Sequence, residues 1–139
     1  MKLWPSRPKA LSFGRLAEIL GCEFLRRQGY LLLASPYRAS RGEIDIVARD
    51  GEFLVFVEVK ARRRDSHPED AVNPVKRQRL VAAAREYRSQ NPRYRTVPWR
   101  FDILAVVAPA GKEADFRLYK DAFREARSHS EHADQDTTD

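Results

Sequence analysis

The sequence predicts an α/β protein in which two helices flank a mixed central β-sheet. Residues 12–28 and 73–89 repeat apolar side chains at helical spacing. Residues 53–57 and 100–107 are continuous apolar runs, which are typical of strands buried on both faces. The dipeptide Asp50-Gly51 lies between residues 42–49 and 52–60, two runs rich in β-branched and aromatic residues, and indicates a tight hairpin of two antiparallel strands. The expected order of elements is α-β-β-β-α-β, followed by a marginal last strand.

The first helix is expected to begin after Ser12, a residue type that caps helices. Leu16, Leu20 and Phe24 recur every fourth residue and mark its buried face. At about 100° per residue, Glu18 does not belong to that face. Glu18 is therefore either an exposed helix residue or an acidic contributor to a site.

The hairpin strands carry charged side chains among apolar ones. Side chains alternate between the two faces of a strand, so Glu43 and Asp45 share one face of the first strand. By the same rule, Glu58 and Lys60 share one face of the second strand. Burying such charges at the end of an apolar run is costly unless they have partners.

A divalent metal ion would compensate for this cost. Mg²⁺ prefers oxygen ligands, and Asp45 and Glu58 from neighbouring strands are suitable. Lys60 would then orient the attacking water, assist its deprotonation or stabilise charge on a phosphate. The alternative is an ion pair between Glu58 and Lys60, with Asp45 in solvent. The tight turn that joins the two strands favours the metal site.

The second helix is expected to begin at Asn73-Pro74, where Asn caps the helix and Pro takes its first position. Its buried face is expected to comprise Leu80, Ala83, Ala84 and Tyr87. Lys76 lies one turn before Leu80 and is expected to point along the sheet towards the carboxylates. After the strand at 100–107, residues 116–119 are predicted to form an edge strand and residues 121–127 a short helix.

The charge balance indicates a polyanionic partner. The net charge is +6, and residues 128–139 contain acidic residues but no Lys or Arg, so the remainder is more basic still. Nucleic acid is the simplest partner, although ribosomal RNA, a membrane surface or a solubilising role would suit the same charge. With one cysteine, Cys22, an intramolecular disulfide is impossible. Because residues 1–9 lack the apolar run of a signal peptide and no stretch has transmembrane length, a cytoplasmic protein is expected.

Several arginines are candidates for phosphate contacts, because a guanidinium can bridge two phosphate oxygens. They precede or follow the predicted carboxylate strands, and ordinary surface charge is the alternative for each: Arg38, Arg41, Arg62, Arg63 and Arg64.

Four other residues have a structural alternative to a functional role. His67 is expected to be a surface histidine because no partner is visible nearby. Tyr94 and Trp99 can stack on unpaired bases, but packing on their own domain is the more common role. Asp102 shares a face with Leu104, which predicts a structural pair or a supporting role behind the metal ligands.

These motifs together resemble the YraN family of small bacterial proteins. That family is predicted to belong to the PD-(D/E)xK nuclease superfamily and is similar to archaeal Holliday-junction resolvases. The resemblance extends over roughly residues 12 to 107. It rests on Gly14, Glu18, Gly29-Tyr30, Gly42-Glu43-Ile44-Asp45, Phe56-Val57-Glu58-Val59-Lys60, Lys76 and Arg100-Phe101-Asp102.

The resemblance implies a restriction-endonuclease-like fold and assigns roles to particular residues. Asp45 and Glu58 would bind Mg²⁺, for which Mn²⁺ can substitute. Lys60 would be the catalytic lysine, and Glu18 the glutamate of the first helix. Because Glu43 shares a face with Asp45, it would be a further ligand or would support the ligands. Lys76 would support the ligands from the second helix.

The resulting hypothesis is a metal-dependent endonuclease that hydrolyses phosphodiester bonds in DNA, with branched or junction DNA as one option. The alternatives are a nucleic-acid-binding module that does not cut and a basic interaction protein that retains the fold. The predicted organisation is a flexible basic arm (1–11), one nuclease-like domain (12–127) and a disordered acidic tail (128–139). A homodimer would suit a junction with two-fold symmetry.

Overall fold

The computed structural model describes residues 12–62, 73–107 and 113–124. The predicted arm and tail lie outside the described residues, as do Arg63, Arg64 and His67. Within the described ranges, neither helix combines the length and the apolar character that crossing a bilayer requires.

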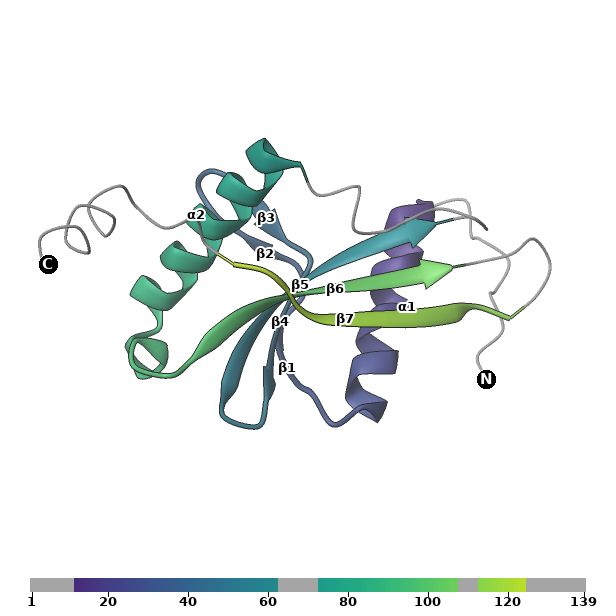
Figure 1. Cartoon of the computed structure of the whole chain (residues 1–139), viewed down its shortest axis with the longest axis horizontal. Coiled ribbons are helices and arrows are strands. Elements are labelled where there is room, and N and C mark those ends of the chain that lie inside the picture. The colour runs from purple at the N-terminus through teal and green to yellow at the C-terminus, as the bar shows by residue number, and fades with distance from the viewer. Residues whose placement is uncertain (1–11, 63–72, 108–112, 125–139) are drawn as a thin grey trace, which may run out of the picture.

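A five-stranded mixed sheet forms the centre of the molecule (Figure 1). Its strands, in spatial order, are β1 (Leu31–Ala34), β4 (Ile46–Asp50), β5 (Phe53–Arg62), β6 (Trp99–Val107) and β7 (Asp115–Phe123). β5 and β6 run parallel, whereas the other neighbouring pairs are antiparallel. The predicted α/β architecture with a mixed central sheet is confirmed.

Both expected helices are present, at the two ends of the view in Figure 1. α1 spans Phe13–Arg27 and is capped by the Ser12 side chain, whereas α2 spans Pro74–Gln90 and is capped by Asn73. A 3₁₀ helix, η2 (Pro92–Tyr94), follows α2.

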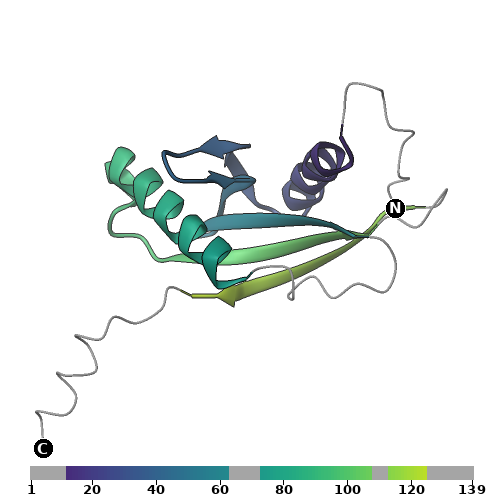
Figure 2. The same ribbon diagram turned by 90° about the horizontal axis from the view of Figure 1, so that it is seen from above.

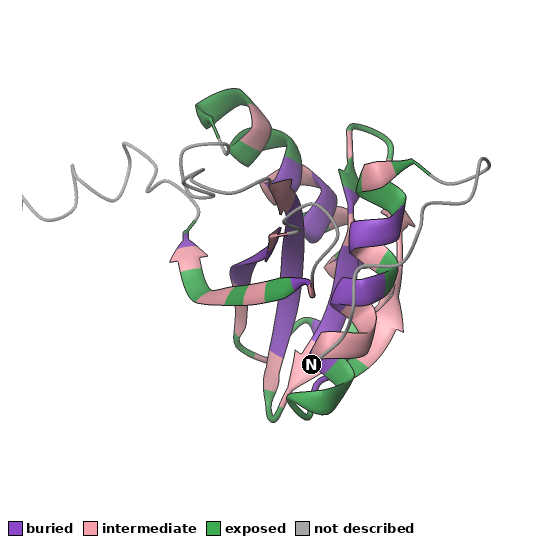
Figure 3. Cartoon of the chain, turned by 90° about the vertical axis from the view of Figure 1, so that its right-hand side faces the viewer, coloured by how far each residue is buried: buried purple, intermediate pink, exposed green. Residues whose placement is uncertain are grey.

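The two helices cover opposite faces of the sheet because the side chains of β5 alternate. Val55 and Val57 belong to the apolar cluster that includes α1, whereas Leu54 and Phe56 belong to the cluster that includes α2. Figure 3 shows the buried residues concentrated in the central strands and on part of α1. Glu58 continues the alternation of Phe56 and therefore belongs to the α2 face.

The predicted hairpin between β4 and β5 is confirmed. Asp50 pairs with Phe53 across the ladder, and Gly51 occupies the turn with a φ of +61°. This left-handed conformation favours glycine, which has no Cβ to clash with the backbone.

The strand expected over residues 42–49 is not continuous. It is divided at Asp45 into β3 (Glu43–Ile44) and β4, and β3 pairs with β2 (Tyr37–Arg38) in a separate two-stranded sheet. Asp45 marks the division because its own Oδ2 accepts the backbone N–H of Val59 at 2.8 Å. The β2–β3 hairpin lies beside α2 (Figures 1 and 2), where the Tyr37 hydroxyl donates to Gln90 Oε1 at 2.8 Å.

The expected short helix over residues 121–127 is wrong at its start, because residues 121–123 belong to β7. The Asp121 backbone N–H donates to Asp102 Oδ1 at 3.0 Å, and the Phe123 ring stacks on Phe101 with centroids 4.6 Å apart. These contacts hold the chain on the sheet edge beyond the predicted strand.

Candidate functional site

Three acidic residues from separate parts of the chain converge near the division between β3 and β4. Glu18 comes from α1, Glu43 from β3, and Asp45 lies between β3 and β4. One carboxylate oxygen of each lies within 4.8 Å of those of the other two. We call Glu18, Glu43 and Asp45 the acidic cluster. It contains the first-helix glutamate that helical periodicity alone could not assign.

The second group of charges is centred on Glu58, whose exposed fraction is 6%. Its Oε1 lies 2.6 Å from Lys76 Nζ and 3.3 Å from Lys60 Nζ. Lys76 thus points from α2 towards the sheet, as its position in the helix predicts. The Glu58–Lys60 ion pair, considered above as the alternative to a metal site, is present alongside the acidic cluster.

Burial acts on the pKa values of Asp45 and Glu18. It raises the pKa of Asp45 to about 7, and the negative charge of Glu58 adds to the effect, whereas the hydrogen bond from Val59 opposes it. Burial also raises the pKa of Glu18, although Arg15, whose Nη1 lies 3.4 Å from Glu18 Oε2, opposes this shift. Because these carboxyl groups resist ionising together, a bound cation would stabilise their charged forms.

The pKa values of Lys60 and Lys76 shift in opposite directions. Burial lowers the pKa of Lys60, whose exposed fraction is 8%, and neighbouring Lys76 lowers it further, against the attraction of Glu58. Burial also acts to lower the pKa of Lys76, but its contact with Glu58 outweighs this and raises it. Lys76 is therefore the more firmly charged of the two, and Lys60 releases its proton more readily than an ordinary lysine.

Ser35, which directly follows β1, also contacts the site. Its hydroxyl donates to the backbone carbonyl of Asp45 at 3.0 Å, and the Cys22 thiol lies 3.4 Å from the same hydroxyl. No local pattern marks this contact, because it depends on how β1 and β4 fold together.

Asp102 lies apart from the acidic cluster. It is fully buried in β6, pairs in register with Val57 and therefore belongs to the α1 face rather than the face of Glu58. Among the described residues, its carboxylate accepts hydrogen bonds from Tyr30, Arg100 and Asp121. This geometry agrees with the structural pairing expected of Asp102.

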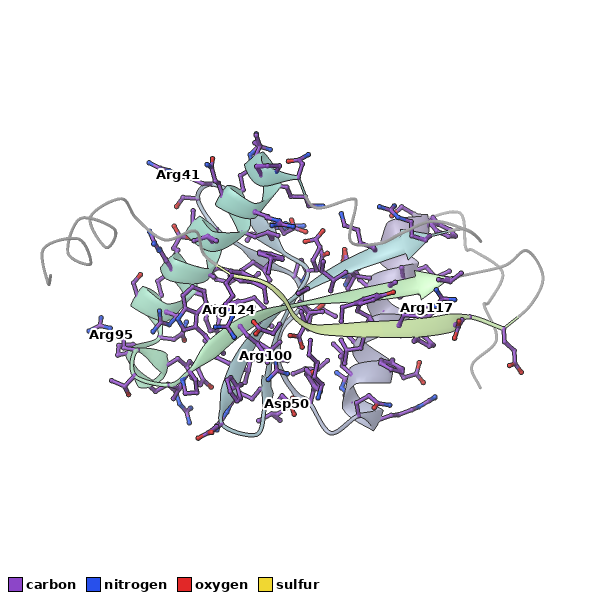
Figure 4. All side chains as sticks on the ribbon, in the orientation of Figure 1. Arg41, Asp50, Arg95, Arg100, Arg117 and Arg124 are labelled. Carbon is purple, nitrogen blue, oxygen red and sulfur yellow. The ribbon has the colours of Figure 1, made fainter. Side chains whose placement is uncertain are left out.

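The candidate phosphate-binding arginines differ in their surroundings. Arg38 Nε lies 3.5 Å from Glu43 Oε2, in an exposed ion pair. Arg41 is exposed at the β2–β3 turn (Figure 4), and Arg62 is half-buried at the end of β5. Of the aromatic candidates, Tyr94 is buried and stacks on Tyr87 with centroids 6.2 Å apart, so it packs on its own domain.

Comparison with known proteins shows the family of the chain. Residues 17–106 match the model of a family described as "Uncharacterised protein family UPF0102". The chain belongs to the UPF0102 family. A UPF0102 protein of Syntrophus aciditrophicus is 42% identical over 116 residues, which cover 81% of this chain and 89% of that protein. One from Chloroflexus aurantiacus is 40% identical over 103 residues, covering 74% and 85%. The family assignment agrees with the YraN-like resemblance of the sequence.

Proposed function

We propose that this UPF0102 protein is a metal-dependent endonuclease with a PD-(D/E)xK-like site, acting on phosphodiester bonds in DNA, including branched or junction DNA. The observation that carries the proposal is that the acidic cluster, drawn from separate elements, lies close enough to Glu58 to interact with its charge, and that buried Glu58 contacts both Lys60 and half-buried Lys76. Carboxylates adjoining a lysine of lowered pKa suit hydrolysis of a phosphodiester.

The residues fit a hard divalent cation. Asp45, Glu18 and Glu43 would hold it through carboxylate oxygens, and the raised pKa of Asp45 supports the need for a compensating positive charge. Glu58, whose charge acts on both Asp45 and Glu18, would complete the set while it remains paired with Lys76. When bound, Mg²⁺ or Mn²⁺ would neutralise phosphate oxygens and the charge that develops on them.

Lys60 is proposed to move the proton. As the oxygen of the attacking water forms a bond to phosphorus, one phosphorus–oxygen ester bond breaks. Lys60, in its neutral form, accepts the proton that the water loses, and the departing oxygen takes a proton from solvent. Lys76 remains charged and stabilises negative charge on the phosphate.

The test compares wild-type protein with Lys60→Ala on labelled single-stranded, duplex and four-way-junction DNA. Each is incubated with Mg²⁺, with Mn²⁺ and with chelator. We expect metal-dependent cutting that falls about 10²-fold or more in Lys60→Ala, because the proton acceptor is lost. Glu58 keeps its contact with Lys76 in this variant, so the fold should persist, which circular dichroism checks.

The matched control is Arg117→Ala, which removes an exposed positive charge from β7. It should cut at the wild-type rate. Equal cutting by wild-type protein and Lys60→Ala would reject the role assigned to Lys60. DNA binding without cutting, by the wild-type protein and both variants and with either metal ion, would favour a non-catalytic nucleic-acid-binding module.

A further inference from the structure

A cleft lies between the turn of the β2–β3 hairpin and the first turns of α2. Its volume is about 570 Å³, within the range of small-ligand sites. Arg41, Gly42 and Glu43 line it from the hairpin, and Val75, Lys76 and Arg79 line it from α2. Of these residues, the sequence motifs single out Arg41, Gly42, Glu43 and Lys76.

The two walls of the cleft are fixed to each other. A Cβ at Gly42 would lie 3.3 Å from the backbone oxygen of Arg79, so the absence of a side chain lets the hairpin approach the helix closely. About two helical turns further along α2, the Glu86 carboxylate accepts hydrogen bonds from the backbone N–H and the hydroxyl of Ser40, in the β2–β3 turn, at 3.0 Å and 2.6 Å. The cleft is therefore a built feature and not a gap between loose segments.

The cleft adjoins the candidate site through two shared residues. Glu43 lines the cleft and belongs to the acidic cluster. Lys76 also lines it and contacts Glu58. A molecule in the cleft would therefore lie directly next to a phosphate bound at the site.

The lining combines apolar and cationic groups. Pro74, Val75 and Leu80 contribute apolar surface, and Val75 keeps 58% of its surface exposed although it is a large apolar residue. Arg41 and Arg79 are exposed, and neither forms an ion pair with another residue of the described ranges. Apolar surface next to unpaired cations is complementary to a nucleotide, which has a flat base and an anionic phosphate.

We propose that this cleft binds an unpaired nucleotide that flanks the cleaved phosphate. The base contacts Val75 and Pro74, and its phosphate meets Arg79 and Arg41. A continuous duplex keeps its bases stacked and offers only phosphates, so it leaves the apolar wall without a partner. The inference rests on the proposed function and narrows its substrate to single strands or branched DNA with unpaired nucleotides.

The test measures binding in chelator, where no cutting occurs, by fluorescence anisotropy at fixed salt. The probes are a labelled oligothymidylate about 20 nucleotides long, an abasic strand of the same length and a duplex of the same length. We expect the oligothymidylate to bind about 5-fold or more tightly than the other two. Val75→Ser should weaken oligothymidylate binding about 3-fold and leave abasic binding unchanged, which isolates the base contact.

Arg79→Ala should weaken binding of both single strands alike, because both carry the phosphate. Arg117→Ala removes the same charge from β7, far from Arg41 in Figure 4. This variant should bind the oligothymidylate and the abasic strand as tightly as the wild-type protein does. Equal binding of all three probes, or an equal loss on both single strands in Val75→Ser, would overturn the nucleotide cleft, as would no binding at all. Metal-dependent cutting lost in Lys60→Ala, found together with such a result, would leave the proposed nuclease standing and reject the cleft alone.

Discussion

At the scale of single residues, Glu58 links the charge states of the two lysines. Its Oε1 contacts both Nζ atoms, but the contact with Lys76 is the shorter, at 2.6 Å against 3.3 Å. Lys76 thereby takes most of the stabilisation that a buried carboxylate offers a cation, and its own charge opposes protonation of Lys60. The pKa of Lys60 therefore depends on Glu58 and Lys76 together.

Replacing Lys76 by Met should raise the pKa of Lys60. The variant removes a neighbouring positive charge and leaves Glu58 paired with Lys60 alone. Cutting at neutral pH should fall about 10-fold, and the pH–rate profile should move to higher pH. The ¹³C shift of the Lys60 ε-carbon, followed against pH, reports the same change directly. The control is Lys120→Met, which removes a lysine whose Nζ lies 3.3 Å from Asp50 Oδ2. An unchanged pKa of Lys60 in Lys76→Met would contradict the coupling between the two lysines.

Asp45 should make the metal-free protein less stable as pH rises. Its pKa of about 7 in the folded state exceeds the ordinary value of 3.8, so the folded state binds the proton more tightly than the unfolded chain. The free energy of unfolding in chelator should therefore decrease between about pH 4 and pH 7, by on the order of 3 kcal/mol from this group. Urea denaturation at a series of pH values measures it.

Asp45→Asn is the matched variant, because it keeps the shape and removes the charge. This part of the pH dependence should disappear in it, and calorimetric affinity for Mn²⁺ should fall. In wild-type protein the affinity for Mn²⁺ should increase up to about pH 7, since binding displaces the proton. A pH-independent affinity, or one unchanged in Asp45→Asn, would argue against a metal at Asp45.

At the scale of elements, a buried polar network joins the strands on the face of the sheet opposite to Glu58. Arg100 of β6 contacts Asp102 on its own strand at 2.9 Å and Asp50 at the end of β4 at 2.7 Å (Figure 4). The Tyr30 hydroxyl donates to Asp102 at 2.9 Å, and Asp102 also accepts from β7. The Asp102 carboxylate thus links Tyr30, β6 and β7, which lie far apart in the sequence.

Asp102→Ala should destabilise the fold by about 3–5 kcal/mol, because it leaves the Arg100 and Tyr30 donors buried without this partner. Thermal or urea denaturation measures the loss. Asp115→Ala removes an exposed carboxylate 3.7 Å from Arg117 on β7 and should cost less than about 1 kcal/mol. Equal effects of the two variants would show that the network does not hold the sheet.

Local signals predicted the elements whose form is decided locally. The caps at Ser12 and Asn73 and the turn at Gly51 are examples, since each depends on residues adjacent in sequence. The division of the strand at Asp45 was not predictable, because it results from a side chain that bonds to the backbone of Val59 in another strand. The extent of β7 likewise depends on Asp102, far away in sequence.

At the scale of the whole molecule, the topology brings together charges that the sequence separates. The spacing of Asp45, Glu58 and Lys60 on a hairpin was enough to predict a group of neighbouring charges. Glu18 became part of it only through the packing of α1, and the cleft beside Arg79 only through the close approach of β3 to α2. Helical periodicity predicted that Lys76 points towards the sheet. It could not predict that Lys76 Nζ lies 2.6 Å from Glu58 Oε1.

Binding to DNA should weaken steeply as salt rises, because a chain of net charge +6 would release counterions from the phosphates it contacts. For a single strand, the logarithm of the association constant should fall linearly with the logarithm of salt concentration, by about 0.7 per phosphate contact.

Arg41→Ala should reduce this slope by about one contact. Arg124→Ala is the matched control, because that guanidinium is already paired with Asp121 at 2.6 Å and has less charge to offer a phosphate. Anisotropy titrations at several salt concentrations give the slopes. A slope near zero would mean that the basic surface serves another purpose, such as docking on a protein, and an equal change in both variants would remove Arg41 from the contact.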